Sequence, residues 1–393
     1  MDFQTKKQVK AKKIALAIVT LAIFVDIIIY SMIIPLLPQF THQLHLTENT
    51  ANLLYGSYAW GLLLVLPLAG WASDRFGRRR PMVWGLIGLL VSTFMFMGAN
   101  QLGWLVVARV LQGVSAAFNW TAGLALLADF FPKEERGKAM GIAFSGTSLA
   151  NLVGPPLSGW LFDLGGLTWP FIFAAILVLI DLLARVLFLK DKGNFQDRER
   201  VPTHWKGLFS PMNVFYFVNI VIAASIISLI EPTLSIFLDK SIHFSPQKIG
   251  LLFGAMTLTS AIFYPLGGYL SDKFSRVKIL TIGFVGVAVF FGILPLRLED
   301  WYLFTVAALI GAFGGLHFAP IIPAISENAE NNGIGYGVLY AIFNLIYTIG
   351  IAIGPLIAIL ITVPQYGIVS LTSMGIFAVT YIWMTNSHKK QIV

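Results

Sequence analysis

Twelve long apolar stretches dominate this sequence and restrict the folds that are open to it. Each is long enough to cross a bilayer as a helix, which takes about 20 residues. They lie at 14–38, 50–72, 81–99, 102–127, 138–162, 168–189, 213–238, 247–270, 278–296, 301–325, 335–362 and 366–385. They are continuously apolar, whereas the strands of a membrane β-barrel alternate. Charged residues make up only 12% of the chain, so the sequence predicts an all-α membrane protein with 12 transmembrane helices.

Lys and Arg are distributed unevenly among the segments between these stretches. All but four of the 27 lie in the two termini, in alternate loops or at the helix ends beside those loops. Cytoplasmic loops carry such an excess, so we expect both termini in the cytoplasm and a multi-pass protein of the cell membrane. This topology accounts for the net charge of +8. No basic run is interleaved with base-stacking aromatic residues, and we expect no binding of nucleic acid.

The two halves of the sequence repeat one another. The segment GWASDRFGRRRPM follows the second apolar stretch, and GGYLSDKFSRVKI follows the eighth. At an offset of 198 residues, Asp74 corresponds to Asp272. The same offset places Asp129 on Glu327, and VGPPL recurs as IGPLI 200 residues later. Such repeats in a membrane protein are typical of transporters with a site at the interface of the halves.

A polar segment in the middle of the chain, KDKGNFQDRERVPTHWKG, separates the two halves. We therefore predict two pseudo-symmetric six-helix bundles, 1–189 and 213–393, joined by a cytoplasmic linker at 190–212. The first apolar stretch is too long for a signal-peptide core and is followed by no cleavage site, so we interpret it as a retained span. The chain has no Cys, which excludes disulfides and thiol chemistry.

Asp26 lies near the middle of the first stretch, in LAIFVDIIIYSMIIPLLP. An ionised carboxylate there costs at least about 2.5–3.5 kcal/mol, so it is paired, protonated or faces water. No basic residue lies within two helical turns, and Tyr30 at i+4 offers at most one hydrogen bond. The alternative is a paired acid that holds helices together. We interpret Asp26 as the group that binds a substrate ammonium in one state and a proton in another.

Glu231 is a second acid within a span, and Pro232 follows it. Proline removes a backbone donor and kinks a helix, which can direct Glu231 into a cavity. The alternative is an acid that reaches the outer interface, since Asp239 is only two turns away. We interpret Glu231 as a proton-coupling residue with a different task from Asp26.

Three further groups within spans carry charge or can carry it. Arg109 requires partners, which can be backbone carbonyls of other spans. His317 has no His or acid near it in sequence, so we expect no metal site; a core histidine and a proton relay remain equally open. Asp181 and Arg185 are spaced i, i+4, which predicts a local ion pair with a structural role.

Aromatic side chains can complete a cation site, because ring faces attract ammonium groups by about 0.5–2 kcal/mol each. Most aromatic residues of such a chain face lipid or the interfaces. We select Tyr30, Phe343 and Tyr347 as candidates for a substrate pocket, together with Asn344. Tyr347 follows Asn344 by three residues and shares its helix face.

These motifs resemble the major facilitator superfamily over essentially the whole chain. GWASDRFGRRR is similar to the signature of its loop between spans two and three, and RVLQGVSAA, with Arg109, to that of span four. The resemblance implies a proton-pathway or helix-contact role for Arg109. It also implies a cytoplasmic gate, to which it assigns Gly70, Asp74, Arg75, Gly77 and Arg78, with Asp272 and Arg276 as a weaker second copy.

GTSLANLVGPPLSGW resembles the span-five signature of the drug:proton antiporters. The matching residues are Gly146, Ala150, Gly154, Pro155 and Gly159. Small residues let helices approach closely; the resemblance adds a seal against leak. Asp26 with IPLLP, and LIEPTLSIF around Glu231, are similar to the vesicular monoamine transporters. The chain departs from that subfamily at Asn344, where those proteins carry an acid, and lacks its span-two lysine.

The residues and the resemblance together predict a proton-coupled antiporter that exports organic cations, either aromatic monoamines or hydrophobic drugs, by alternating access. Its partners would be the small-molecule cation, protons and the lipid bilayer, and we expect a monomer. No nucleotide loop, metal cluster or catalytic set suggests an enzyme or a cofactor. One alternative is a facilitator or proton symporter for a neutral solute such as a sugar. Another is a membrane receptor that transports nothing.

Overall fold

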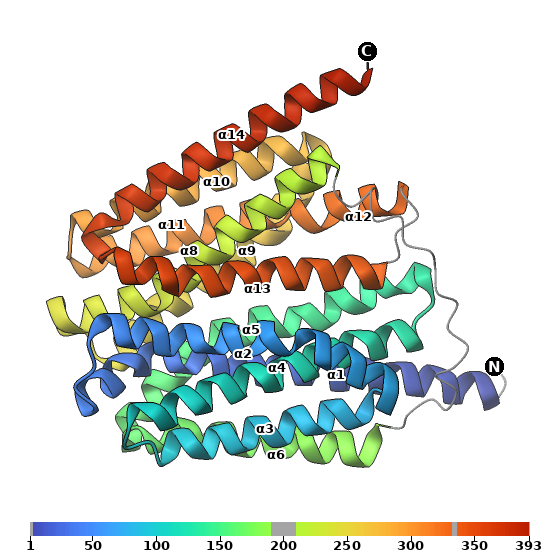
Figure 1. The fold of residues 1–393 in the computed structure, drawn as a ribbon, viewed down its shortest axis with the longest axis horizontal. Helices are drawn as coiled ribbons and strands as arrows, with labels where there is room; N and C mark the ends of the chain where they lie inside the picture. Colours follow the sequence, from blue (N-terminus) through green and yellow to red (C-terminus); the bar gives the residue numbers. More distant parts are fainter. Residues whose placement is uncertain (1–2, 190–209, 332–335, 393) are drawn as a thin grey trace. The chain divides into compact units, whose positions relative to one another are not determined.

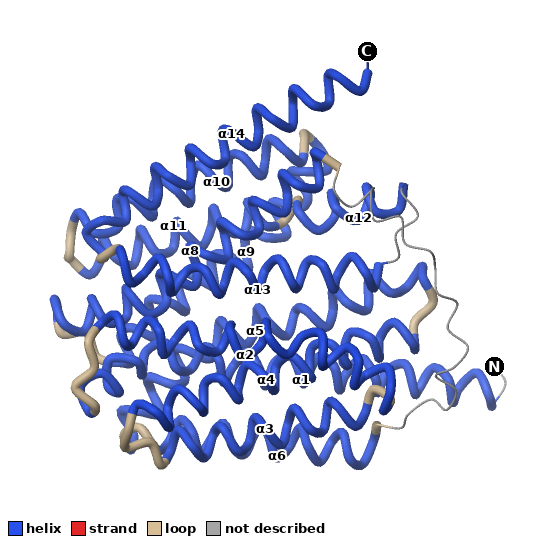
Figure 2. The backbone as a smooth tube through the Cα atoms, viewed as in Figure 1, coloured by secondary structure: helices blue, strands red, loops and turns tan. Residues whose placement is uncertain are grey.

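A computed structural model describes residues 3–189, 210–331 and 336–392, and these form helices joined by short loops (Figures 1 and 2). The chain divides into two compact units, Met1–Arg200 and Val201–Val393. The division falls within the predicted linker, most of which lies outside the described residues. Unit 1 contains α1 (Phe3–Gln43), α2 (Glu48–Phe76), α3 (Arg79–Met97), α4 (Leu102–Phe130), α5 (Lys133–Gly165) and α6 (Thr168–Phe188). Unit 2 contains α8 (Pro211–Ile242), α9 (Pro246–Lys273), α10 (Arg276–Ile293), α11 (Asp300–Phe318), α12 (Ile321–Asn331), α13 (Tyr336–Leu360) and α14 (Tyr366–Ile392), with 3-10 turns η1 (Leu294–Leu296) and η2 (Val363–Gln365).

The predicted fold class, an all-α membrane protein, is confirmed. Among the described residues, 11 helical segments are long and apolar enough to cross a membrane. The exception among the long helices is α5, with 33 residues. Its predicted span, 138–162, is helical, but glycine, serine and proline residues dilute its apolar content. The prediction at 301–325 is interrupted after Phe318, where α11 ends and α12 begins three residues later.

Polar caps and prolines determine where several helices begin. Thr47 accepts a hydrogen bond from the backbone N–H of Thr50 at the start of α2. Ser210 and Ser245 cap α8 and α9 in the same way, and each is followed directly by a proline. Proline is favoured at the first helical position because its fixed φ suits the helix and the missing N–H is not needed there.

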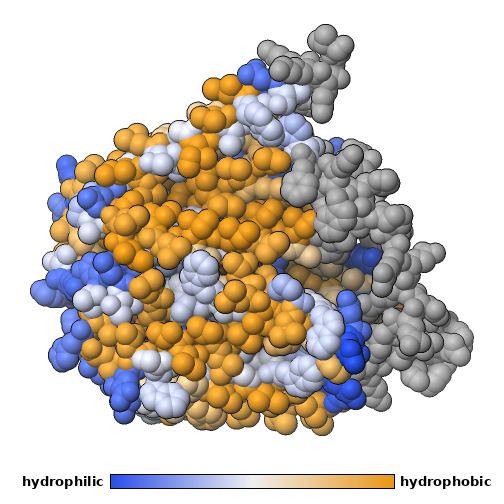
Figure 3. Space-filling view, viewed as in Figure 1, coloured by the Kyte–Doolittle hydropathy of each residue, from blue (hydrophilic) through white to orange (hydrophobic). Residues whose placement is uncertain are grey.

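The outer surface of each unit is apolar. Figure 3 shows hydrophobic side chains over much of the visible face. Large side chains such as Leu64 (75% exposed) and Leu371 (72% exposed) would be costly in water. In a bilayer they are in contact with acyl chains instead, which agrees with the membrane assignment.

Small residues permit a close helix contact in unit 1, between α1 and α5. A Cβ at Gly154 would collide with Ser31 Oγ, and one at Gly146 would lie 2.8 Å from the carbonyl oxygen of Thr20. Two hydroxyl groups cross the interface: Ser31 Oγ donates to the Ala150 carbonyl at 3.4 Å, and Ser158 Oγ donates to the Met32 carbonyl at 2.6 Å. The crossing is therefore held by backbone proximity and polar contacts together.

Unit 2 repeats this arrangement between α8 and α13. A Cβ at Gly354 would collide with Ser228 Oγ, and one at Gly350 would lie 2.6 Å from the Cβ of Ala224. Ser225 Oγ donates to the Gly350 carbonyl at 3.0 Å. Because Gly354 lies 200 residues after Gly154, the sequence repeat corresponds to a repeated helix contact.

Candidate functional site

Asp26 is fully buried in unit 1, where it accepts hydrogen bonds from two other helices. Trp120 Nε1, on α4, donates to Oδ2 at 2.9 Å, and the Tyr58 hydroxyl, on α2, donates to the same oxygen at 3.4 Å. The other oxygen, Oδ1, has no hydrogen-bond partner in the described part of the chain. Neither donor carries a charge, and the cations Arg185 and Arg109 act on Asp26 through space rather than by a hydrogen bond.

Arg109 lies on the other side of Tyr58 from Asp26 and is enclosed by three tyrosine rings. Its guanidinium carbon is 4.9 Å from the ring centre of Tyr30, 4.6 Å from that of Tyr55 and 5.1 Å from that of Tyr58. Nε donates to the Tyr55 carbonyl at 3.4 Å, and Nη1 donates to Gln112 Oε1 at 2.7 Å. These cation–π contacts compensate part of the cost of burying the charge. The Tyr30 ring, which was predicted to contact a substrate cation, thus contacts Arg109 in this structure.

Tyr58 connects the acid to the cation, because its hydroxyl donates to Asp26 while its ring faces Arg109. The local geometry follows from the close crossing of α2 and α4. A Cβ at Gly113 would collide with the Tyr58 carbonyl, and one at Gly61 would collide with the Val110 carbonyl. Glycine at these two positions therefore brings the tyrosines of α2 against α4.

A second buried charge cluster in unit 1 contains the predicted ion pair. Arg185 and Asp181, both on α6 and fully buried, form two hydrogen bonds of 3.1 and 2.6 Å. Arg185 Nη1 also donates to the Met82 carbonyl and to Asn119 Oδ1, each at 2.8 Å. The prediction of a local pair is confirmed, and the structure adds contacts to α3 and α4.

Glu231 lies on α8 in unit 2, with 8% of its surface exposed, directly before the in-helix Pro232. It interacts electrostatically with Tyr347 on α13. The Tyr347 ring is nearly parallel to Phe343, with centres 6.2 Å apart. Asn344 lies on the same helix and is partly buried. Unit 2 thus brings Glu231 close to the predicted Tyr347, whereas Tyr30 belongs to unit 1.

His317 is buried on α11, with 2% of its surface exposed. Its Nδ1 lies 3.2 Å from the Leu280 carbonyl of α10, and the ring contacts Phe284 and Phe318. Nε2 has no hydrogen-bond partner among the described residues. Those residues contain no group of three or more potential ligands that could hold a metal ion.

The loop motif between α2 and α3 of unit 1 is organised by Arg78, a residue with 3% of its surface exposed. It donates to Asp129 at 3.0 Å, to Asp74 at 2.9 Å and to Ser73 Oγ at 2.5 Å. Gly77 ends α2 with φ 83°, which favours glycine. The motif therefore ties the α2–α3 turn to the last turn of α4.

The second copy of the motif forms the matching ion pair. Arg276 binds Glu327, and each lies 198 residues after its counterpart, Arg78 or Asp129. Ser275 stands before Arg276 where unit 1 has Gly77, and its φ of −170° is open to any residue. Asp272 is exposed. The missing glycine therefore reflects a different turn rather than the loss of the contact.

Two other residues of the predicted gate lie outside these ion pairs. Arg75 is exposed, and its guanidinium carbon lies 5.5 Å from the Trp71 ring centre. Gly70 has free space where a Cβ would be. Of the span-five residues, Gly146, Gly154 and Ala150 form the α1–α5 contact described above, while Pro155 and Gly159 are buried farther along α5.

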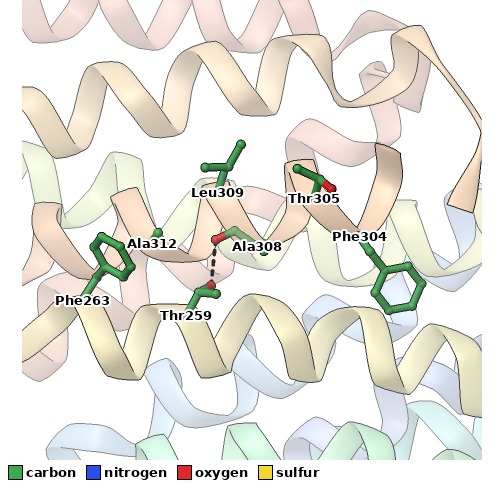
Figure 4. Close-up of a pocket in the computed structure, with 7 residues that line it drawn as sticks. All are labelled: Thr259, Phe263, Phe304, Thr305, Ala308, Leu309 and Ala312. Atoms are coloured by element: carbon green, nitrogen blue, oxygen red, sulfur yellow. Dashed lines mark hydrogen bonds between the residues drawn. The ribbon is translucent and has the colours of Figure 1, made fainter. Parts of the chain in front are cut away.

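A pocket of 420 Å³ opens on α9 and α11, lined by Thr259, Phe263, Phe304, Thr305, Ala308, Leu309 and Ala312 (Figure 4). Thr259 Oγ1 donates to the Ala308 carbonyl at 2.7 Å, and Thr305 Oγ1 donates to the Trp301 carbonyl. The lining contains no charged residue, so this pocket offers no counter-ion to a cation.

Three residues of the unit 1 site were not predicted from the sequence: Trp120, Tyr55 and Tyr58. The spacing of Arg109 and Trp120, eleven residues or about three turns, places both on one face of α4. Tyr55 and Tyr58 are spaced i, i+3. These patterns were visible, but the sequence does not show which helices meet.

The internal repeat, the membrane-spanning helices and the acids buried within them define a membrane transporter. The sequence model of the Major Facilitator Superfamily matches residues 19–230 and 216–392. The chain belongs to the Major Facilitator Superfamily.

Relatives and a solved structure agree with this assignment. The chain is 26% identical to the vesicular acetylcholine transporter of Drosophila melanogaster, over 90% of this chain and 67% of that one. It is 27% identical to multidrug resistance protein 2 of Bacillus subtilis, over 89% of both. It is 30% identical to the chromaffin granule amine transporter of Rattus norvegicus, over 77% of this chain but only 59% of that one. A crystal structure of a bacterial homologue of the human lysosomal transporter Spinster has the same fold, with a TM-score of 0.72 at 14% identity over 96% of each chain.

Proposed function

We propose that this protein is a proton-coupled antiporter that exports organic cations, either aromatic monoamines or hydrophobic drugs, across the cell membrane by alternating access. The observation that carries this proposal is Asp26, a fully buried carboxyl group held only by neutral donors, with Oδ1 unoccupied by any described hydrogen-bond donor. A buried carboxylate needs a positive partner. A substrate ammonium and a proton both meet that need, and they exclude one another.

Exchange follows from this competition. When the site is open to the cytoplasm, the ionised Asp26 carboxylate binds the cation. When the site is open to the outside, a proton replaces the cation, and the protein with neutral Asp26 returns to the cytoplasm-facing state. Tyr58 transmits the change, because it contacts both Asp26 and the Arg109 guanidinium. Arg109 and His317 are our candidates for the proton pathway.

In unit 2 we assign Glu231 to proton coupling and the neighbouring Tyr347, Phe343 and Asn344 to the substrate pocket. Glu231 is nearly buried beside a proline that interrupts the backbone hydrogen bonds of α8. The aromatic rings of Phe343 and Tyr347 on α13 offer the ring faces to which organic cations bind. The names of the relatives support the substrate class, since they include an acetylcholine transporter, an amine transporter and a multidrug resistance protein.

Transport in proteoliposomes tests this function. The probes are 1-methyl-4-phenylpyridinium and tetraphenylphosphonium, aromatic cations whose charge does not change with pH. Vesicles with an acidic lumen should accumulate at least one of them above the external concentration, and protein-free vesicles or vesicles without a pH gradient should not. Sugar uptake with no cation uptake would instead establish the neutral-solute alternative, and uptake of neither would remove the proposal.

Two substitutions separate binding from coupling. Asp26→Asn mimics the protonated state, so cation binding to the purified protein should fall at least tenfold and lose its pH dependence. Glu231→Gln should retain binding but abolish uphill accumulation. Full affinity in the Asp26→Asn variant with an unchanged pH profile would remove Asp26 from the site, and accumulation at the wild-type level by Glu231→Gln would remove its coupling role.

A further inference from the structure

The buried pair Asp181–Arg185 has no role in the transport cycle proposed above. Buried ion pairs rarely add net stability, because desolvation offsets much of their attraction. This one is nevertheless fully satisfied: Arg185 binds both carboxylate oxygens of Asp181, the Met82 carbonyl and Asn119 Oδ1. One guanidinium group thereby joins α3, α4 and α6.

Asn119 and Trp120 are consecutive residues of α4, and they face different neighbours. Asn119 accepts the hydrogen bond of Arg185, and Trp120 donates the 2.9 Å hydrogen bond to Asp26. The packing around Asn119 is tight, since a Cβ at Gly85 of α3 would lie 2.7 Å from Asn119 Oδ1. Arg185 therefore fixes the rotation of the α4 turn that presents Trp120 to Asp26.

Arg185 also acts on Asp26 through space. The other titratable or charged groups that act on Asp26 are Tyr58 from α2 and Arg109 from α4. Behind them lie Tyr30 from α1, whose ring contacts Tyr58, and Asp181 from α6, which is paired with Arg185. The charged residues of α5 lie near its two ends, remote from this level. Asp181 reduces the effect of Arg185, because an anion beside a cation weakens its distant field.

We propose, on the basis of the antiport function above, that Asp181 and Arg185 are a positioning pair for Asp26. Through Asn119 they hold Trp120 against the carboxylate, and through their field they set the pH range in which Asp26 exchanges a proton for an organic cation.

Opposite shifts of the pH profile test this role. Arg185→Gln removes a cation that favours ionised Asp26, so half-maximal binding of 1-methyl-4-phenylpyridinium or tetraphenylphosphonium should move to higher pH by about one unit. Asp181→Asn removes the anion that masks Arg185, so the midpoint should move to lower pH. If Arg185→Gln fails to fold, Arg185→Lys keeps the charge and should leave the midpoint in place, while Asp181→Asn still moves it down.

A purely structural role would give a different result. Loosening of α4 would move both variants in one direction, or lower affinity without moving the midpoint, and either result overturns the inference. Wild-type protein with no pH-dependent cation binding would instead remove the proposed antiport function itself. The control pair is Lys248–Asp300, an exposed ion pair of unit 2, whose neutralisation by Lys248→Gln should leave the midpoint unchanged.

Discussion

One indole nitrogen has a large effect on the unit 1 site. Trp120 Nε1 makes the shorter of the two hydrogen bonds to Asp26, 2.9 Å against 3.4 Å for Tyr58. Hydrogen bonds to charged groups contribute about 1.5–3 kcal/mol. Trp120 therefore favours the ionised carboxylate, which is the form that binds a cation.

Replacing Trp120 by Phe keeps an aromatic ring but removes this donor. We expect cation affinity at neutral pH to fall about tenfold, since about 1.4 kcal/mol corresponds to a factor of ten, and half-maximal binding to move to higher pH. Equilibrium binding across a pH series measures both effects. Trp104→Phe, on the same helix with 54% of its surface exposed, is the matched control and should behave as wild type; an unaltered profile in Trp120→Phe would show that Asp26 does not use this donor.

The sequence identified the buried charged residues of both units but not their neutral partners. Asp26, Glu231 and Arg109 are conspicuous because charge is costly within an apolar span. Trp120 and Tyr58 are ordinary residues for a membrane helix, and only the crossings of α1, α2 and α4 make them ligands of Asp26. Tyr30 was predicted as an aromatic residue of the substrate pocket, and the structure shows its ring against Arg109.

At the level of secondary-structure elements, small residues allow pairs of helices to pack at close range. The α1–α5 contact depends on Gly154 and Ala150, and the α8–α13 contact depends on Gly354 and Gly350. The glycine and alanine stripe predicted from span five therefore has a packing function. The break between α11 and α12 falls at Pro320, a residue type that interrupts helices. The single span predicted at 301–325 did not use this signal, because the apolar run continues across Ala319 and Pro320.

Gly154→Val should force α1 and α5 apart. Overpacking of this kind costs about 1–3 kcal/mol, and the added methyl groups would meet Ser31 and Ile28. Thermal unfolding in detergent should show a lower midpoint for this variant. Gly141→Val on the same helix has free space around it and should unfold at the wild-type temperature or above; equal midpoints for the two variants would contradict the packing role.

At the level of the whole molecule, the sequence repeat corresponds to a repeated ion pair. Each unit carries an ion pair between its loop motif and a more distant segment, Arg78 with Asp129 and Arg276 with Glu327. The 198-residue offset between the two halves predicted that Asp129 corresponds to Glu327. This offset holds even where the residue types of the two halves differ. The two-bundle boundaries at 1–189 and 213–393 stay a prediction.

The topology prediction can be checked directly because the natural chain contains no Cys. Single cysteines at Arg75 and Lys273 should react with a membrane-impermeant maleimide only when the cytoplasmic face is opened. Cysteines at Asn49 and Glu299 should react in intact cells. All four positions are exposed, so accessibility to solvent does not bias the comparison. Labelling of Lys273→Cys in intact cells would overturn the predicted cytoplasmic placement of the second motif.

The modest apolar content of α5 has a consequence for biogenesis. A segment that does not qualify as a membrane span on its own composition partitions weakly from the translocon into lipid. Its partner α1 is synthesised more than a hundred residues earlier, and it offers the glycine-matched surface and the hydroxyl groups that α5 requires. We therefore expect α1 to remain next to the translocon until α5 has been synthesised, so that the two helices enter the bilayer together. The N-terminal bundle would then form by delayed, cooperative insertion.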